Sequence, residues 1–182
     1  MAEHLLEVRN LSVEFHTAVG VVKAVRNISY HLDRGETLAI HGESGSGKSV
    51  SSSAIMNLID MPPGRISSGE ILLDGVDLLK MPAQQRREVN GRRIAMIFQD
   101  PLSHLNPVYT VGRQIAEVFE SHCEHGRGSV RDKVVQLMQR VGIPEPEKRI
   151  DHYPHQFSGG QRQRVMIAMA IALKPDILIA DE

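Results

Sequence analysis

The stretch Gly42–Ser49, GESGSGKS, fits the pattern G-x-x-x-x-G-K-[ST] and lies between a short apolar run and a helical pattern. That is the context of a phosphate-binding loop. Its glycines let the backbone curl so that successive N–H groups converge on phosphate oxygens, and the helix N-terminus adds partial positive charge. Lys48 is then expected to reach the β- and γ-phosphates, and Ser49 to give its hydroxyl to Mg²⁺. The residues predicted to bind nucleotide are Gly42, Glu43, Ser44, Gly45, Ser46, Gly47, Lys48, Ser49 and Val50.

Two acids end the apolar run ILIADE, Ile177–Glu182. A buried strand that runs into Asp181 places a carboxylate at the carboxyl edge of a parallel sheet, where ligands of open α/β sheets bind. Asp181 can then hold Mg²⁺, and Glu182 can orient or deprotonate an attacking water. An isolated strand that ends in acids more often just meets solvent. Together with the phosphate loop, however, the two acids indicate a metal-dependent nucleotide site.

A third candidate site is the helix start at FSGGQ, which follows the phosphate loop by more than a hundred residues. Ser158 is a good N-cap, and Gly159 and Gly160 leave the first-turn N–H groups uncovered. Such a helix end suits an anion, although a capped helix with closely packed glycines is the simpler reading. Because one nucleotide cannot occupy two helix ends in different subdomains, we expect this end to receive the nucleotide of a second chain.

The first half of the chain reads mainly as strands around the loop. Alternating and β-branched residues predict strands over Leu5–Phe15 and Val21–Leu32. Thr37–His41 is short and apolar, so we expect a buried strand that feeds the phosphate loop. A helical pattern then runs from Lys48 to about Leu58.

Further strands are predicted over Gly69–Gly75 and Arg93–Asp100, with a polar surface helix over Pro82–Val89 between them. Amphipathic helices are predicted over Val111–His122 and Ser129–Gly142. The helix after Ser158 carries a core-facing stripe with i, i+3, i+4, i+7 spacing. The stripe consists of Val165, Met166, Ala168, Met169, Ala172 and Leu173.

These elements predict an α/β protein with a helical insertion. We expect residues 1–100 to form a β subdomain and the phosphate-loop core, 101–157 a helical subdomain, and 158–182 a helix and a core strand. The composition, 41% hydrophobic and 24% charged over 182 residues, suits one globular domain with a small insertion.

Charge and cysteine content limit the partners. The net charge of -1 without a long Lys/Arg run gives no electrostatic footprint for nucleic acid, so none is expected. A single cysteine, Cys123, fits a reducing compartment. The longest apolar run, Val165–Leu173, is about half of the ~20 residues that a spanning helix needs. We therefore expect work at a membrane to take place on its surface or through a docked partner.

Four motifs in a fixed order, GESGSGKS, FQDP, FSGGQRQR and ILIADE, resemble the nucleotide-binding subunit of an ABC transporter, and the match covers nearly the whole chain. The resemblance implies a RecA-like P-loop NTPase core with an N-terminal antiparallel β subdomain and an inserted α-helical subdomain. It also implies that two such domains face head to tail and trap two ATP molecules, each between one chain's phosphate loop and the other's SGGQ.

The resemblance also implies residue roles. Gln99 would lie near the metal and the attacking water, as a third catalytic group beside Lys48 and Glu182, and would signal to the helical subdomain. Phe15 is a candidate for the aromatic that stacks on adenine. In isolation, Gln99 reads as a strand-end polar residue and Phe15 as a core residue. The γ-phosphate of the partner's nucleotide would meet Ser158, Gly159, Gly160 and Gln161.

A narrower resemblance is to the ATPase subunits of dipeptide and oligopeptide importers, with nickel and glutathione importers as near relatives. It rests on FQDPLSHLNP, on YPHQFSGGQRQRVMIAMA, and on Phe157, where other members of the family have leucine. It implies a second ATPase subunit, two permease subunits and an external solute-binding protein, at the cytoplasmic face of a bacterial or archaeal inner membrane. The solute stays open, as does the choice between homodimer and heterodimer, although the subgroup favours a heterodimer.

The sequence departs from the family at Glu182, where it stops. Family members continue with a dimer-contact loop, another strand and a histidine that supports hydrolysis. We expect a polypeptide that ends here to expose a sheet edge, to fold poorly alone or to be a fragment, and to bind nucleotide better than it hydrolyses it.

Two other functions compete with peptide import. One is a soluble ABC-type ATPase of DNA maintenance or translation; the absence of sustained heptads between the phosphate loop and SGGQ argues against its coiled-coil members. The other is a truncated nucleotide-binding fragment without turnover. Several histidines and the cysteine in the second half of the chain could suggest a metal, but no four-ligand set has zinc-like spacing. Surface or packing roles are therefore expected for His122, Cys123, His125, His152 and His155.

Overall fold

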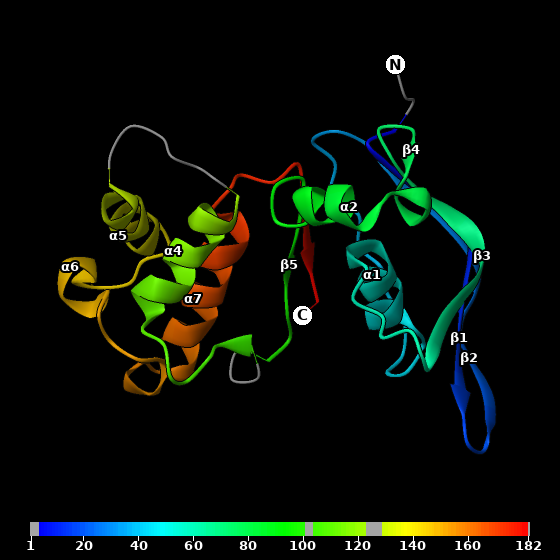
Figure 1. Ribbon diagram of the computed structural model, residues 1–182, viewed down its shortest axis with the longest axis horizontal. Coiled ribbons are helices and arrows are strands. Elements are labelled where there is room, and N and C mark those ends of the chain that lie inside the picture. The colour runs from blue at the N-terminus through cyan, green and yellow to red at the C-terminus, as the bar shows by residue number, and fades with distance from the viewer. Residues whose placement is uncertain (1–3, 101–103, 123–128, 182) are drawn as a thin grey trace. The chain divides into compact units, whose positions relative to one another are not determined.

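The computed structural model describes residues 4–100, 104–122 and 129–181. The chain divides into two compact units, Met1–Arg86 and Arg87–Glu182 (Figure 1). The division precedes strand β5 (Ile94–Ile97) and therefore groups this strand with the helices, whereas the sequence analysis placed residues 1–100 together.

The first unit contains an antiparallel sheet with strand order β2-β1-β3-β4. Its strands are β1 (Leu6–Thr17), β2 (Gly20–Leu32), β3 (Gly64–Leu73) and β4 (Val76–Asp77). The two N-terminal strands agree with the sequence analysis, while β3 begins five residues before the expected strand because residues 64–68 also pair with β1. The buried side chains of this sheet include Leu6, Val8, Leu11, Val13, Ile71 and Leu73.

A bulge in β1 keeps this apolar face continuous. The strand register shifts between Val8 and Leu11, and Asn10 has a φ of 49°. Side chains three residues apart therefore both face the core, although strict alternation would put them on opposite faces. Opposite the bulge, a Cβ on Gly69 would lie 2.6 Å from the Leu11 Cα, so only glycine allows β3 to approach this closely.

Helix α1 (Lys48–Met56) packs on β1 and β2 and buries Ala54, Ile55 and Met56. It ends where Asn57 takes a left-handed conformation, with a φ of 56°. A 3-10 helix, η1 (Leu78–Lys80), and the helix α2 (Ala83–Val89) follow β4. The predicted helices after the phosphate loop and after Pro82 are thus confirmed.

The expected buried strand over residues 37–41 is wrong. This segment has no regular structure, and the exposed fractions of Leu38 and Ile40 are 40% and 46%. A strand needs a neighbouring backbone to hydrogen-bond, and none of the described strands pairs with this segment. An apolar composition by itself therefore does not make this segment a strand.

In the second unit, β5 pairs in parallel with β6 (Ile177–Ala180), and Ile97 lies opposite Ala180. All four residues of β5 are buried. Both strands occupy apolar runs that the sequence assigned to strands. At their other end, Arg93 Nε lies 2.6 Å from Asp176 Oδ2, an ion pair across the two strand starts.

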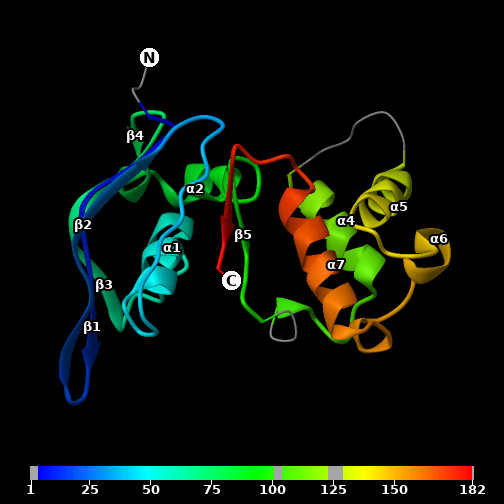
Figure 2. The ribbon, with the colours of Figure 1, turned by 180° about the vertical axis from the view of Figure 1, so that it is seen from behind.

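The second unit also contains helices α4 (Val111–Ser121), α5 (Val130–Arg140), α6 (Pro146–Arg149) and α7 (Gly159–Ile171), with the 3-10 helix η2 (Pro154–Gln156) before α7. Helix α7 packs against α4 and α5, as both views show (Figures 1 and 2). Thr110 and Ser129 cap α4 and α5 by accepting hydrogen bonds from Arg113 N and Asp132 N. No helix in the described part of the chain is both long enough and apolar enough to span a bilayer.

Helix α7 has two buried sides rather than one. Val165 and Ala168 join the core of α4 and α5, and Met169, Ala172 and Leu173 pack around it. Met166 and Ala170 instead contact Ala95 and Ile97 of β5. The predicted stripe is therefore buried in part, and it is divided between a helical core and a strand.

Candidate functional site

The phosphate-loop residues adopt a turn that only glycines permit. Gly45 and Gly47 have φ values of 79° and 94°, in the left-handed region. A Cβ on Gly47 would lie 2.3 Å from the backbone oxygen of Ala24 in β2, so no larger residue fits. Gly47 is also the N-cap of α1 and makes no side-chain cap, which leaves the first N–H groups of the helix available to a ligand.

Lys48 folds back over this loop. Its ammonium donates hydrogen bonds to the carbonyl oxygens of Gly42 (2.6 Å) and Glu43 (2.8 Å). The side chain thus bridges the two ends of the turn and holds its charge at the loop. Ser49 lies exposed in the first turn of α1, while Val50 is half-buried. Arriving phosphate oxygens can take the place of the carbonyls as acceptors for the lysine.

A buried serine that the sequence analysis missed supports Lys48 from below. The exposed fraction of Ser51 is 2%, and its hydroxyl donates to the carbonyl oxygen of Lys48 at 2.8 Å. Burial raises the pKa of the Tyr30 phenol on β2, and a hydrogen bond with Ser51 partly offsets this rise. Ser51 therefore ties the first turn of α1 to the sheet. Its position three residues after the lysine, in a helix, is the signal that could have identified it.

Phe15 lies in the same unit as the phosphate loop. It is half-buried in β1, opposite Gly64 of β3, and its ring atom Cε1 would lie 3.2 Å from a Cβ on Gly64. The missing side chain of Gly64 thus leaves space that the ring uses. The role of Phe15 in stacking on adenine stays a prediction.

Gln99 and Asp181 lie in the second unit, at the carboxyl ends of β5 and β6. Ile97 pairs with Ala180, and Asp181 N donates to the Ile97 carbonyl oxygen at 3.0 Å. Gln99 is exposed two residues beyond Ile97. An amide and a carboxylate at one sheet edge provide the hard oxygen donors that Mg²⁺ prefers, so the residues present fit the metal. Glu182 lies outside the described residues.

The second candidate helix end belongs to α7. Ser158 Oγ accepts a hydrogen bond from Gln161 N (3.3 Å), and Gln161 Oε1 accepts one from Ser158 N (3.1 Å). This capping box is the arrangement expected of a serine N-cap followed by glutamine at N3. Gly159 and Gly160 are exposed, and nothing lies within 4 Å of a Cβ built on either. The first turn is therefore open to an incoming group.

Arg149, another residue that the sequence analysis missed, contacts this helix end. Its Nη1 donates to Gln161 Oε1 at 3.3 Å, and its guanidinium carbon lies 5.9 Å from the centre of the Phe157 ring. Phe157 is buried in the helical core. Arg149 therefore adds positive charge beside the first turn of α7 and links Gln161 to the packed part of the subdomain.

The structure groups the candidate residues into two sets. Phe15 and residues 42–50 belong to the first unit, and Gln99, Asp181 and residues 158–161 to the second. Three of the histidines named in the sequence analysis make contacts within the second unit. His122 Nε2 lies 3.0 Å from the Asn90 carbonyl oxygen, His152 contacts the Phe157 ring edge-on, and His155 stacks on Tyr153. Cys123 and His125 lie outside the described residues.

Comparison with known sequences identifies a family. The family model described as "ABC transporter" matches residues 25–182. The chain is 54% identical over 178 residues to the oligopeptide transport ATP-binding protein OppD of Bacillus subtilis (strain 168), covering 98% of this chain and 50% of that protein. It is 51% identical over 178 residues to the dipeptide transport ATP-binding protein DppD of Escherichia coli (strain K12), covering 98% and 54%. The chain thus spans about half the length of these curated relatives.

Solved structures show the same relationship. The ATP-binding cassette MJ0796, in a dimeric post-hydrolysis state with ADP and Pi, superposes with a TM-score of 0.81 at 25% identity, covering 96% of this chain and 72% of that one. The protein cbiO1 from Clostridium perfringens, part of the ABC transporter complex cbiONQ, has a TM-score of 0.70 at 28% identity, covering 98% and 65%. The predicted P-loop fold class is thereby confirmed.

Proposed function

Because the chain belongs to the ABC transporter family, we propose that it is the ATP-binding and ATP-hydrolysing part of a subunit that energises an importer of dipeptides or oligopeptides. The observation that carries the proposal is the loop before α1, where Gly47 leaves the helix end uncapped and Lys48 holds its charge over the loop. The similarity to transport proteins for oligopeptides and dipeptides supports the choice of substrate.

In this proposal the chain's own groups position and neutralise the phosphates. The N–H groups of residues 42–50 and the ammonium of Lys48 bind the β- and γ-phosphates of ATP, and Ser51 keeps the lysine backbone in place. Phosphoryl transfer to water depends mainly on such positioning and on charge stabilisation. Phe15 is proposed to stack on the adenine.

Ser49, Gln99 and Asp181 are proposed to hold Mg²⁺, and Glu182 to orient the attacking water. Held by these residues, Mg²⁺ would supply positive charge that offsets the charge developing on the phosphates. The support is the placement of Gln99 and Asp181 at one edge of the β5–β6 pair. Gln99 is also proposed to report nucleotide state to the helices that follow it in the chain.

A second ATPase subunit is proposed to complete each site. The open first turn of α7, with Ser158, Gly159, Gly160 and Gln161, would contact the γ-phosphate bound by the partner. Closure of the two subunits on ATP and reopening after hydrolysis would then drive the membrane permease subunits. A solute-binding protein outside the membrane would supply the peptide. The proposed location is the cytoplasmic face of a bacterial or archaeal inner membrane.

A binding assay tests the nucleotide site. Lys48→Ala is expected to weaken binding of a fluorescent ATP analogue roughly 10- to 100-fold, because a hydrogen bond to a charged group contributes about 1.5–3 kcal/mol. Lys148→Ala is the matched control, since Lys148 is an exposed lysine paired with Glu145. Equal affinity of the two variants would refute the proposed site. Import of labelled dipeptides by the assembled transporter, with ATPase turnover lost in Lys48→Ala, tests the wider role.

A further inference from the structure

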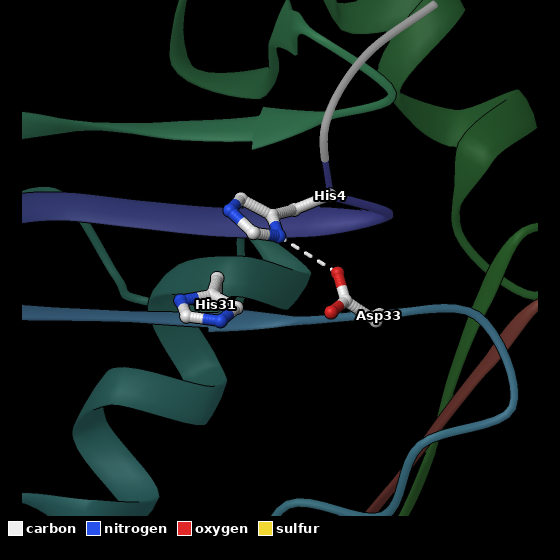
Figure 3. Close-up of side chains that lie close together, drawn as sticks. All are labelled: His4, His31 and Asp33. Atoms are coloured by element: carbon white, nitrogen blue, oxygen red, sulfur yellow. Dashed lines mark hydrogen bonds and ion pairs between the residues drawn. The ribbon is translucent and has the colours of Figure 1, made fainter.

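Two histidines and an aspartate gather at one end of the first unit's sheet. Among the described residues, His4, His31 and Asp33 form a group whose ligand atoms all lie within 4.8 Å of one another (Figure 3). His4 Nδ1 lies 2.7 Å from Asp33 Oδ1. The two imidazole rings stack, with centres 3.9 Å apart and planes 26° apart. The nucleotide site uses none of these side chains.

The pairing of β1 with β2 creates this group. Leu6 lies opposite Leu32, and Leu5 N donates to the Leu32 carbonyl oxygen at 3.0 Å. His4 precedes this paired segment, while His31 and Asp33 flank Leu32. Leu5 also accepts a hydrogen bond from Asp74 N at 2.9 Å, and the exposed fraction of its side chain is 5%. The backbone that carries the three side chains is therefore held by neighbouring strands and by the core.

The local charge suits a cation. Asp33 N donates to Glu36 Oε2 at 2.8 Å, which brings a second carboxylate to the turn. Glu7 lies opposite His31 in the ladder, and Arg9 donates hydrogen bonds to its carboxylate at 2.6 and 2.7 Å. Arg34 binds the carboxylate of Asp74 at 2.9 and 3.0 Å. The nearby arginines are thus engaged by carboxylates other than Asp33.

We propose that His4, His31 and Asp33 bind a divalent transition-metal ion such as Zn²⁺, with water completing the coordination. Two imidazoles and one carboxylate match the donors that Zn²⁺, Co²⁺ and Ni²⁺ take, whereas Mg²⁺ prefers oxygen ligands alone. Donors about 2.0–2.2 Å from one ion lie roughly 3–3.5 Å apart. The stacked rings would have to turn so that a nitrogen lone pair in each ring plane faces the ion, and the exposed His31 and Asp33 have room to move while His4 is half-buried.

Binding would replace the hydrogen bond between His4 and Asp33 by two bonds to the ion, with both imidazoles neutral. The ion would then tie the residues before β1 to the end of β2. Because an ion that binds only the folded chain stabilises it by mass action, the sheet becomes more stable as the metal concentration rises. The site resembles open catalytic zinc sites in having three protein ligands, but no reacting group is assigned to it.

Metal titration of the nucleotide-free protein tests the site. Calorimetry with Zn²⁺ is expected to give one ion per chain, and Co²⁺ to give visible absorption bands that change on binding. His31→Ala and the isosteric Asp33→Asn are expected to weaken binding about 10-fold or more, since even supporting residues of metal sites contribute 10- to 100-fold. The control is His16→Ala, which removes an exposed histidine 3.0 Å from Glu14 Oε1. Within the described ranges, no third ligand donor is grouped with this pair.

Two results would overturn the proposal. One is wild-type protein with neither a stoichiometric Zn²⁺ site nor a Co²⁺ spectrum. The other is a loss of affinity in His16→Ala equal to that in His31→Ala, which would mean scattered surface histidines bind the ion. Circular dichroism of each variant checks the fold. If His31→Ala unfolds, Asp33→Asn decides the comparison, and the wild-type Co²⁺ spectrum does not depend on any variant.

Discussion

At the scale of single residues, the proposed nucleotide site depends on one glycine and one lysine. Gly47 takes a left-handed conformation against the backbone of β2, which turns the chain into α1 without a side-chain cap. Lys48, the next residue, then returns to the carbonyl oxygens of Gly42 and Glu43. The glycine is required by space and the lysine by charge, so their substitutions should fail in different ways.

Gly47→Ala is expected to lower both stability and nucleotide affinity. The left-handed backbone costs an alanine roughly 1–2 kcal/mol, and the contact of 2.3 Å with the Ala24 oxygen adds a clash. Gly35→Ala is the matched control, because Gly35 has a φ of 75° but nothing within 4 Å of its Cβ position. Urea unfolding should show a larger loss for Gly47→Ala than for Gly35→Ala. Equal losses would mean that the clash relaxes without cost.

At the scale of elements, two helices present their first turns, and each is held in a different way. Helix α1 is joined to the sheet through Ser51 and Tyr30, whereas α7 is held by its own capping box and by Arg149. An anion-binding helix end must be rigid and still leave N–H groups open. The buried Ser51 holds the first turn of α1, and the capping box holds the first turn of α7. Both arrangements meet that need.

The half-buried phenol of Tyr30, which is hydrogen-bonded with Ser51 of α1, should make the free energy of unfolding depend on pH in the alkaline range. Burial raises the pKa of Tyr30, against an offset from its Ser51 hydrogen bond. Above about pH 10, the unfolded chain therefore releases this proton more readily than the folded chain, and the free energy of unfolding falls as pH rises. Tyr30→Phe should remove this part of the slope in urea unfolding. Tyr109→Phe, at an exposed tyrosine, controls for the loss of a phenol. Identical slopes for wild type and Tyr30→Phe would contradict the expectation.

Substitutions of helix-capping serines can distinguish an effect on stability from an effect on activity. Ser158→Ala should lower the free energy of unfolding by about 1 kcal/mol, as expected for an N-cap serine, and should also reduce ATPase turnover. Ser129→Ala removes the equivalent cap of α5, where Ser129 accepts from Asp132 N at 3.1 Å. We expect a similar loss of stability there with turnover unchanged. If both variants lose turnover equally, Ser158 acts only through the fold.

At the scale of the whole molecule, the candidate residues are divided between two compact units. In the proposed function, the open first turn of α7 contacts a nucleotide that another chain binds. Assembly should then depend on nucleotide. If two chains bind each other only while ATP lies between them, hydrolysis of the ATP lets them separate. A transport cycle requires this alternation between closed and open states.

Gly160→Asp tests this assembly. A Cβ at this position meets nothing within 4 Å, and an acid near a helix N-terminus stabilises the helix, so fold and monomer nucleotide binding should be kept. Its negative charge should nevertheless repel the partner's γ-phosphate. Sedimentation with ATP and Mg²⁺ should show dimers for the wild type and monomers for Gly160→Asp, with Gly160→Ala as the uncharged control. Dimers of all three proteins would argue against this contact.

The sequence by itself determined the features that depend on local chain chemistry. The glycine spacing and lysine of residues 42–49 predicted the loop and the start of α1, and Ser158 as an N-cap predicted the start of α7. Strands β1, β2, β5 and β6 followed from their apolar and β-branched runs. Such signals lie within a few neighbouring residues, where conformational preference and capping act, and four of them in order were enough to predict the family.

Only the tertiary structure decided which distant residues meet. Residues 37–41 look like a buried strand in composition but remain exposed, because a strand also needs a partner. Ser51 meets Tyr30, α7 divides its apolar residues between two cores, and His4 reaches Asp33 across the β1–β2 register. These contacts depend on strand register and helix packing, which arise from many weak interactions across the chain and leave no mark in a short stretch of sequence.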